Sequence, residues 1–208
     1  MSDTEELEDV YAAQSAEDTR RIYNKWSHSY DADNLSRGYR LPALGAGLLA
    51  QYLRPDAGPV LDAGSGTGLV GETLRLMGFD HLIACDLSPE MLCVSAATEA
   101  YESFHETDIG AHIPLDDSLC AGFVCVGAFG PGHAPPRSLI ELARVTRPGG
   151  IGVFNLLEAH YVEQGFPDIM QALTDTGRWE QVHVTPPFLP FLLAEPDLWS
   201  RAYVMRML

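Results

Sequence analysis

The chain has 208 residues, and its 29 aspartates and glutamates outnumber 13 lysines and arginines, so its formal net charge is −16. This length suits one α/β domain, so we expect neither a second cofactor domain nor a separate substrate domain. The negative charge disfavours nucleic acid as a partner, because proteins that bind a phosphate backbone carry clustered basic residues. No apolar run reaches the ~18 residues of a membrane-spanning helix, so we expect no membrane partner.

The beginning of the chain is acidic, and we expect residues 1–15 to form a flexible leader. An acidic start also differs from the basic and then apolar start of a secretory signal, which predicts a cytoplasmic protein. Residues 16–208 are expected to form a single domain, with N-terminal helices over 16–54 and an α/β core over 58–208. We expect this domain to be a monomer or a homodimer.

The first helix is predicted to begin after Ser15, a residue type that caps helix N-termini, and to continue as far as Asp31. Tyr23, Trp26 and Tyr30 lie three and four residues apart, so they share one face of this helix. Two interpretations of this aromatic face are open. It packs onto the rest of the domain, or it covers a bound ligand.

After a second helix over Ala43–Arg54 comes the most informative segment of the chain, Val60-Leu61-Asp62-Ala63-Gly64-Ser65-Gly66-Thr67-Gly68. It reads as the end of a buried strand followed by glycines, which permit positive φ and close approach of a ligand to bare backbone. Helical spacing over Leu69–Met77, with Gly78 as the cap, completes a strand, turn and helix. A dinucleotide-binding turn needs G-x-G-x-x-G, but Leu69 stands where the third glycine would be, which disfavours a nicotinamide cofactor.

A second apolar strand over His81–Asp86 also ends in an acid. A carboxylate at this strand end can accept two hydrogen bonds from ribose hydroxyls, so Asp86 indicates nucleoside binding without specifying the cofactor. The residues that follow predict a helix start, because Ser88 is a capping residue, Pro89 suits the first position and Glu90 the first turn.

A third strand is predicted over Ser103–Ile109, and it leads into a turn at Asp108. Leu119–Phe129 is apolar enough to be a central fourth strand that is covered on both faces. The loop over 130–136 then contains one titratable side chain, His133. Its ordinary pKa suits a general base, which makes it the candidate catalytic residue, although a lone histidine in a loop is more often simply exposed.

The last third of the chain completes the alternation of helices and strands. The expected elements are a helix over Pro136–Arg147 that Pro148 stops, a strand over Ile151–Leu156, a helix over Tyr161–Gly177, and strands over 180–185 and 201–207. The proline-rich and apolar segment 186–196 either lines a substrate pocket or covers the edge of the sheet.

The cysteines contain no C-x-x-C pair and lie in apolar or helical contexts. We therefore expect reduced core residues and no metal site, with the four positions being Cys85, Cys93, Cys120 and Cys125.

The pattern D-x-G-x-G-x-G over residues 62–68 resembles motif I of the class I S-adenosylmethionine-dependent methyltransferases. Three further stretches extend the resemblance to about two thirds of the chain: Tyr23-x-x-Trp26-x-x-x-Tyr30-Asp31, Asp86-Leu87-Ser88-Pro89-Glu90-Met91-Leu92 and Arg144-Val145-Thr146-Arg147-Pro148-Gly149-Gly150. Residues 38–44 and 68–71 resemble, more narrowly, the methyltransferase-like proteins related to the Williams–Beuren syndrome region 27 protein.

This resemblance implies a Rossmann-like, doubly wound sheet of seven mostly parallel strands in the order 3-2-1-4-5-7-6, with the last strand antiparallel. It also implies that the N-terminal helices over 16–54 form a lid above the cofactor pocket. The implied cofactor is S-adenosylmethionine, whose product is S-adenosylhomocysteine.

By position, the resemblance places Asp86 at the ribose of the cofactor, and Asp108 and Ile109 at its adenine. The full set of expected cofactor-binding residues is Tyr30, Arg40, Asp62, Ala63, Gly64, Ser65, Gly66, Gly68, Leu69, Asp86, Leu87, Met91, Asp108, Ile109, Val126 and Gly127. The candidates for contact with substrate are Tyr23, Trp26, Tyr39, Phe129 and His133.

The function that these expectations favour is transfer of the sulfonium methyl group to a small-molecule acceptor, neutral or cationic, by in-line displacement. One alternative is a protein that binds S-adenosylmethionine for regulation or for a rearrangement. A nicotinamide-dependent oxidoreductase is a weaker alternative, because the glycine turn lacks the third glycine.

Overall fold

The computed structural model describes residues 9–10, 12–13 and 15–208, so most of the predicted leader lies outside the described residues. Within the leader, Val10 is described and is fully buried against Trp26. At this position the structure differs from the expected flexible leader, because this apolar side chain, which has acidic neighbours in the sequence, packs against an aromatic ring.

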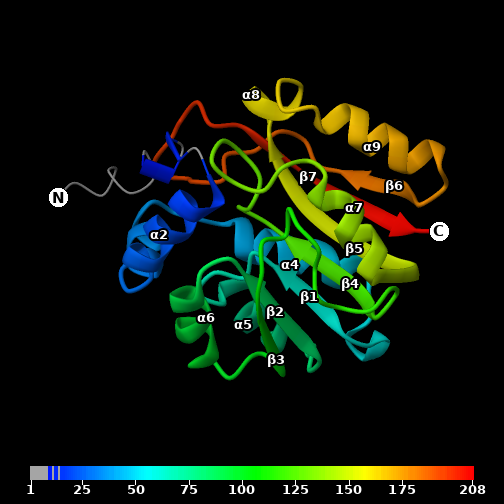
Figure 1. Cartoon of the computed structure of the whole chain (residues 1–208), viewed down its shortest axis with the longest axis horizontal. Helices are drawn as coiled ribbons and strands as arrows, with labels where there is room; N and C mark the ends of the chain where they lie inside the picture. The colour runs from blue at the N-terminus through cyan, green and yellow to red at the C-terminus, as the bar shows by residue number, and fades with distance from the viewer. Residues whose placement is uncertain (1–8, 11, 14) are drawn as a thin grey trace.

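Seven strands form one sheet in the order β3-β2-β1-β4-β5-β7-β6 (Figure 1). Neighbouring strands pair in parallel except at β7, which is antiparallel to both β5 and β6. The predicted fold class is therefore confirmed. The strands are β1 (Val60–Ala63), β2 (Leu82–Asp86), β3 (Ser103–Glu106), β4 (Cys120–Cys125), β5 (Thr146–Leu157), β6 (Trp179–Val184) and β7 (Ser200–Met207).

Helices cover both faces of the sheet because the central strands are apolar on both faces. In β1, Leu61 packs into the core beneath α7 (Ser138–Val145) and α9 (Phe166–Asp175), while Val60 packs into the core on the opposite face. Figure 1 shows α7 and α9 in front of the sheet, with the helices of the other face behind it. Those helices are α4 (Leu41–Tyr52), α5 (Leu69–Leu76) and α6 (Pro89–Ala96).

Residues 16–36 form two helices where the sequence predicted one helix that continued to Asp31. Ser15 caps α2 (Ala16–Trp26) through a hydrogen bond from Asp18 N to Ser15 Oγ of 3.1 Å. The chain then turns before α3 (Tyr30–Ser36), because the serines and histidine of residues 27–29 favour turns, and Ser27 Oγ donates to the backbone of α2.

Two predicted boundaries around β4 and β5 were wrong. β4 ends at Cys125, so residues 126–129 belong to the loop beyond the strand and not to the strand. β5 begins at Thr146, so Pro148 lies inside an irregular strand start and does not stop α7. The register between β4 and β5 shifts between Cys120 and Gly122, so the extra residues at the start of β5 lie outside regular pairing, as in a β-bulge.

The predicted helix over 161–177 is also shorter than expected. A single turn, α8 (Glu158–Tyr161), precedes a break, and α9 begins after Gly165 with Pro167 in its first turn. Gly177 follows α9 at φ +64°, as expected of a glycine that ends a helix.

Three of the cysteines are buried in the sheet as predicted, whereas Cys93 lies on the outer face of α6 and is exposed.

Candidate functional site

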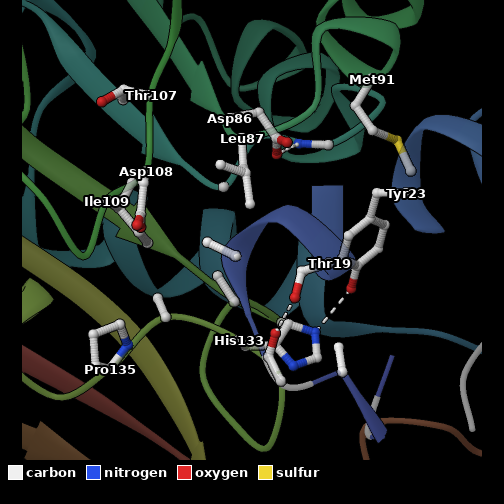
Figure 2. Close-up of a pocket in the computed structure, with 18 of the residues that line it drawn as sticks. Thr19, Tyr23, Asp86, Leu87, Met91, Thr107, Asp108, Ile109, His133 and Pro135 are labelled. Carbon is white, nitrogen blue, oxygen red and sulfur yellow. Dashed lines mark hydrogen bonds between the residues drawn. The ribbon is translucent and has the colours of Figure 1, made fainter. Parts of the chain in front are cut away.

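A cavity of about 360 Å³ opens at the carboxyl ends of β1, β2, β3 and β4. Figure 2 shows Asp86 and Leu87 on one side of it, Asp108 and Ile109 on a second side, and Tyr23 and His133 on a third. This volume is typical of a small-molecule site. The predicted residues that line it are Tyr23, Tyr30, Gly64, Gly66, Asp86, Leu87, Met91, Asp108, Ile109, Val126, Gly127 and His133.

The glycine turn after β1 forms the floor of this cavity, which is called the larger cavity below because a smaller one adjoins it. Gly64 N donates to Cys85 O over 2.8 Å, and Gly66 N donates to Asp86 Oδ2 over 2.8 Å, so the turn is fastened to the end of β2. Gly64 has φ +74°, and a Cβ there would lie 2.9 Å from the Cβ of Ala128. Gly66 has φ +53°, and a Cβ there would have no neighbour within 4 Å. At Gly66 glycine leaves the backbone open to a ligand, whereas at Gly64 it allows the close approach of Ala128.

The carboxylate of Asp86 is held rigidly while it faces the larger cavity. Its Oδ1 accepts from Ser88 N and its Oδ2 from Gly66 N, both over 2.8 Å. Burial raises the pKa of Asp86, and the backbone N–H groups that it accepts from oppose this effect. Each oxygen has a second lone pair, so the side chain can accept two more hydrogen bonds from a ligand.

At a second wall, Asp108 Oδ1 accepts from Gly110 N over 2.7 Å, which orients the carboxylate at the end of β3. Arg137 Nε donates to Gly110 O over 2.8 Å and closes the same turn from the loop before α7. Beside these polar groups, Ile109 and Pro135 give this wall an apolar surface. Such a wall suits a planar, partly polar ring.

Helices α2 and α3 cover the larger cavity. Thr19 Oγ1 donates to Gly132 O over 2.6 Å, and Ser88 Oγ donates to Asn24 Oδ1 over 2.6 Å. In addition, Thr67 Oγ1 donates to Asp31 Oδ1 over 2.5 Å. These bonds join the N-terminal helices to three separate loops of the core, so the aromatic face covers a cavity as well as packing onto the domain.

His133 and Tyr23 form a pair at the inner end of the larger cavity, with Tyr23 Oη 2.8 Å from His133 Nε2. The other ring nitrogen, Nδ1, lies 2.8 Å from Pro131 O, which can only accept. Nδ1 of the neutral ring therefore carries the proton, and Nε2 accepts from the Tyr23 hydroxyl. Burial lowers the pKa of His133, although the bond to Pro131 opposes this effect, so the ring is neutral at pH 7.

A smaller cavity of about 50 Å³ adjoins the larger one. Tyr23, Tyr30, Gly127 and His133 line both cavities, so they form the boundary between them. The smaller cavity brings together the remaining substrate candidates, and its other walls come from α3, the start of α4, the end of β5 and residues 190–198. Its lining includes Trp26, Asn34, Tyr39, Leu41, Phe129, Asn155, Leu157, Pro190, Phe191 and Leu198.

Some expected cofactor-binding residues do not line the larger cavity. Arg40 is turned away, since its Nε donates to Leu189 O over 2.7 Å and its guanidinium lies over the Phe188 ring. Leu69 lines a groove on the outer surface near α4 and α5. The others that do not line it are Asp62, Ala63, Ser65 and Gly68, all of which are buried in β1 and in the turn that follows it.

Asp62 is the most informative of these differences. Its side chain is 1% exposed and accepts from Tyr101 Oη over 2.5 Å, while Gly71 N donates to the same Tyr101 oxygen. Strand alternation points Asp62 to the same face as Val60, away from the cavity. A Cβ on Gly71 would lie 2.3 Å from the tyrosine ring, so this glycine allows the tyrosine to reach the strand.

Several residues that line the larger cavity were not predicted. Ser15, Ala16 and Thr19 come from the first turn of α2, and Thr107 and Pro135 from loops. Only proximity in space identifies them. The capping signal at Ser15 predicted the helix and the resemblance implied a lid, but no signal in the sequence indicated which residues of the helix start line the cavity.

The sheet order, the glycine turn after β1 and the acid at the end of β2 define a class I S-adenosylmethionine-dependent methyltransferase. Residues 61–154 match the family described as a methyltransferase domain. The chain is also 32% identical over 172 residues to Methyltransferase-like protein 27 of Homo sapiens, an alignment that covers 79% of this chain and 69% of that protein. The chain therefore belongs to this methyltransferase family, and S-adenosylmethionine is its cofactor.

Two further similarities extend the comparison. The chain is 35% identical over 178 residues to Malonyl-[acyl-carrier protein] O-methyltransferase of Yersinia pestis, which covers 81% of this chain but only 58% of that protein. A chain in the solved complex between the Haloferax volcanii Trm112 methyltransferase activator and a methyltransferase superposes with a TM-score of 0.67. That match covers 89% of this chain and 97% of the other at 18% identity, so it shows the fold alone.

Across the described part of the chain, no helix has the length and apolar character that a membrane crossing requires.

Proposed function

We propose that this protein transfers the methyl group of S-adenosylmethionine to a small-molecule acceptor that binds in the smaller cavity. The observation that carries the proposal is the boundary shared by the two cavities, formed by Tyr23, Tyr30, Gly127 and His133. In an in-line displacement the acceptor atom must lie close to the methyl carbon, on the side opposite the sulfur. Two adjoining cavities supply that arrangement.

The residues of the larger cavity fit the cofactor. Asp86 has free lone pairs for the ribose hydroxyls, and Asp108 with Ile109 offers one acceptor and one apolar surface to adenine. Gly64 and Gly66 line the cavity, and the open space beside Gly66 leaves room for the amino-acid part. Leu87, Met91, Val126 and Gly127 complete the lining.

When bound, S-adenosylmethionine supplies a methyl group made electrophilic by its sulfonium. The chain itself would position the acceptor and exclude water, because α2 and α3 cover the site. The His133–Tyr23 pair would receive the proton that the acceptor loses. As the Tyr23 hydroxyl takes up this proton, its own proton passes to the unprotonated Nε2 of His133.

The proposed acceptor is a small molecule and not a nucleic acid. A net charge of −16 supports this choice, and so does the absence of lysine and arginine among the described residues that line the smaller cavity. The protein is proposed to act without a nucleic-acid or membrane partner, as a cytoplasmic monomer or homodimer.

The test combines calorimetric titration with S-adenosylhomocysteine and NAD and a methyl-transfer assay against small molecules, RNA and DNA. We expect S-adenosylhomocysteine to bind and NAD not to bind. We expect methyl transfer to small molecules and none to RNA or DNA. We expect His133→Phe, which keeps the ring and removes both nitrogens, to slow transfer about 100-fold while changing the affinity for S-adenosylhomocysteine far less.

The matched control is His81→Phe, at the opposite end of β2, which should behave as the wild type. Transfer to RNA alone would contradict the proposed acceptor. Binding of S-adenosylhomocysteine with no transfer to any acceptor would support the non-methylating alternative.

A valine at position 66 tests the glycine turn. The Cβ at Gly66 would project into open space on the side of the larger cavity, so Gly66→Val should weaken binding of S-adenosylhomocysteine by roughly 1–3 kcal/mol. Gly177→Val is the control, because Gly177 has a similar φ of +64° and also has no neighbour within 4 Å. Both variants should lose about 1–2 kcal/mol of stability from backbone strain. Equal affinities in the two variants, measured by calorimetry, would refute the assignment of Gly66.

A further inference from the structure

Aromatic rings form much of the wall of the smaller cavity, and they reach it from separate parts of the chain. Two rings belong to α2 and one to α3, and the others come from two loops and from segment 186–196; they are Tyr23, Trp26, Tyr30, Tyr39, Phe129 and Phe191. Ring contacts fix their positions. The Trp26 and Tyr30 centroids lie 4.8 Å apart, and those of Tyr39 and Phe191 lie 5.1 Å apart. Rings on several sides of one space are the arrangement that binds an ammonium group by cation–π attraction.

The size of the smaller cavity limits the group that enters it. Its volume is about 50 Å³, whereas an apolar protein cavity of about 150 Å³ holds one benzene molecule. The structure therefore leaves no room there for an aromatic acceptor. An amino, a hydroxyl or a carboxylate group on a short alkyl chain meets this limit.

The charges around the smaller cavity favour a cation. Asp33 Oδ2 accepts from Trp26 Nε1 over 2.7 Å, so a carboxylate lies against the edge of the indole and makes the potential at its faces more negative. Helix α3 also carries Asp31, while Arg37, which follows this helix, does not line the cavity. Among the described residues that line it there is no aspartate, glutamate, lysine or arginine, and His133 is neutral. A carboxylate would find no cation there.

We propose that the smaller cavity binds the amino group of a small aliphatic amine as the ammonium, and that the protein methylates this nitrogen. The inference rests on the proposed function and narrows its acceptor to one chemical class. Of the three groups that fit by size, only the ammonium gains from the rings, because a hydroxyl has no charge for them to attract. The net charge of −16 also favours the approach of a cation.

The Tyr23–His133 pair provides the base that this chemistry requires, because an ammonium has no lone pair with which to attack. Figure 2 shows the two side chains joined by their hydrogen bond, with Tyr23 Oη 2.8 Å from His133 Nε2. One proton leaves the ammonium through the Tyr23 hydroxyl to Nε2. The amine lone pair then forms the N–C bond as the C–S bond breaks, and the electron pair of that bond stays on sulfur. A methylated ammonium and S-adenosylhomocysteine result, and the proton on His133 passes to solvent.

The test uses the full chain saturated with S-adenosylhomocysteine and titrated by calorimetry with propylamine, 1-propanol and propionate, which have equal chain lengths. For the wild type we expect propylamine to bind about tenfold tighter than 1-propanol or more, the effect of a desolvated cation–π contact. Propionate should bind most weakly. With S-adenosylmethionine in place of the product, the expected reaction is conversion of propylamine to N-methylpropylamine.

Two variants examine the charge and the rings separately. In Asp33→Asn the amide oxygen still accepts from Trp26 Nε1 but carries no charge, so the preference for propylamine over 1-propanol should fall about threefold. Its control is Asp168→Asn, since Asp168 is an exposed acid that also lies in the first turn of a helix and lines neither cavity.

Phe191→Leu keeps an apolar side chain and removes one ring from the wall, so the same preference should again fall about threefold. Its control is Phe104→Leu, because Phe104 is 39% exposed on β3 and lines neither cavity. Both control variants should keep the full preference of the wild type, and affinity for 1-propanol should be nearly constant across all four.

Three outcomes would overturn the inference while leaving the proposed function intact. They are equal binding of propylamine and 1-propanol to the wild type, a preference that both Asp33→Asn and Phe191→Leu leave unchanged, and methyl transfer to 1-propanol or propionate but not to propylamine. Failure of the wild type to bind S-adenosylhomocysteine would instead refute the proposed function.

Discussion

Asp86→Asn should weaken binding of S-adenosylhomocysteine by about 3 kcal/mol or more, which is at least ~100-fold in affinity. Both carboxylate oxygens of Asp86 accept from backbone N–H groups, one from Gly66 and one from Ser88. Either orientation of an asparagine amide would therefore direct an N–H₂ donor at a backbone donor. The substitution would disturb the glycine turn and would also remove an acceptor for the ribose.

Calorimetry with the purified variant checks this prediction. The matched control is Asp56→Asn. Asp56 is an exposed acid that precedes β1, so it lies at the amino-terminal ends of the strands, whereas the larger cavity lies at their carboxyl ends. Its affinity should equal that of the wild type. If Asp86→Asn and Asp56→Asn bound the product equally well, Asp86 would have no role in holding the cofactor.

Asp62 is expected to make the stability of the fold depend on pH. Burial raises the pKa of Asp62 to about 7, while the hydrogen bond from Tyr101 opposes this rise and the nearby charge of Asp86 adds to it. The folded protein therefore binds the Asp62 proton more tightly than the unfolded chain, whose carboxyl has a pKa near 3.9. Stability from this group is complete below about pH 4 and is lost as the pH rises to about 7.

Asp62→Asn should remove this dependence, because the amide oxygen still accepts from Tyr101 Oη and carries no charge. The free energies of unfolding in urea should agree near pH 4, and at pH 8 the variant should be more stable by as much as ~4 kcal/mol. Tyr101→Phe removes the bond that opposes the shift, so its loss of stability should extend to higher pH. Parallel pH profiles for the wild type and Asp62→Asn would show that Asp62 ionises normally in the folded protein.

Most elements of the core were predictable because their signals lie in neighbouring residues. The strand ending at Asp86 and the helix start at Ser88 depend on local alternation and capping, and the structure confirms both. The misplaced boundaries had tertiary causes. β5 begins at Thr146, for example, because it pairs with Cys120 of β4, a contact that local propensity does not contain.

The residues of the candidate site likewise fall into those that local sequence patterns predicted and those that they did not. The glycines and the acid after β2 were found from the sequence because main-chain conformation and strand ends leave local patterns. The cover from α2 was implied by resemblance, yet the residues of its first turn were missed. Their role depends on bonds such as that from Thr19 Oγ1 to Gly132 O, between positions far apart in the chain.

The amino-acid order alone predicted the alternation of strands and helices, the glycine turn and the acid after β2 from short-range patterns, and the resemblance carried by these motifs implied the doubly wound sheet. Only the tertiary structure decided which of two similar residues faces the larger cavity. Asp86 faces the larger cavity and Asp62 does not, because Tyr101 holds Asp62 on the other face of β1. Side-chain direction and distant partners make this distinction, and both arise only when the chain has folded.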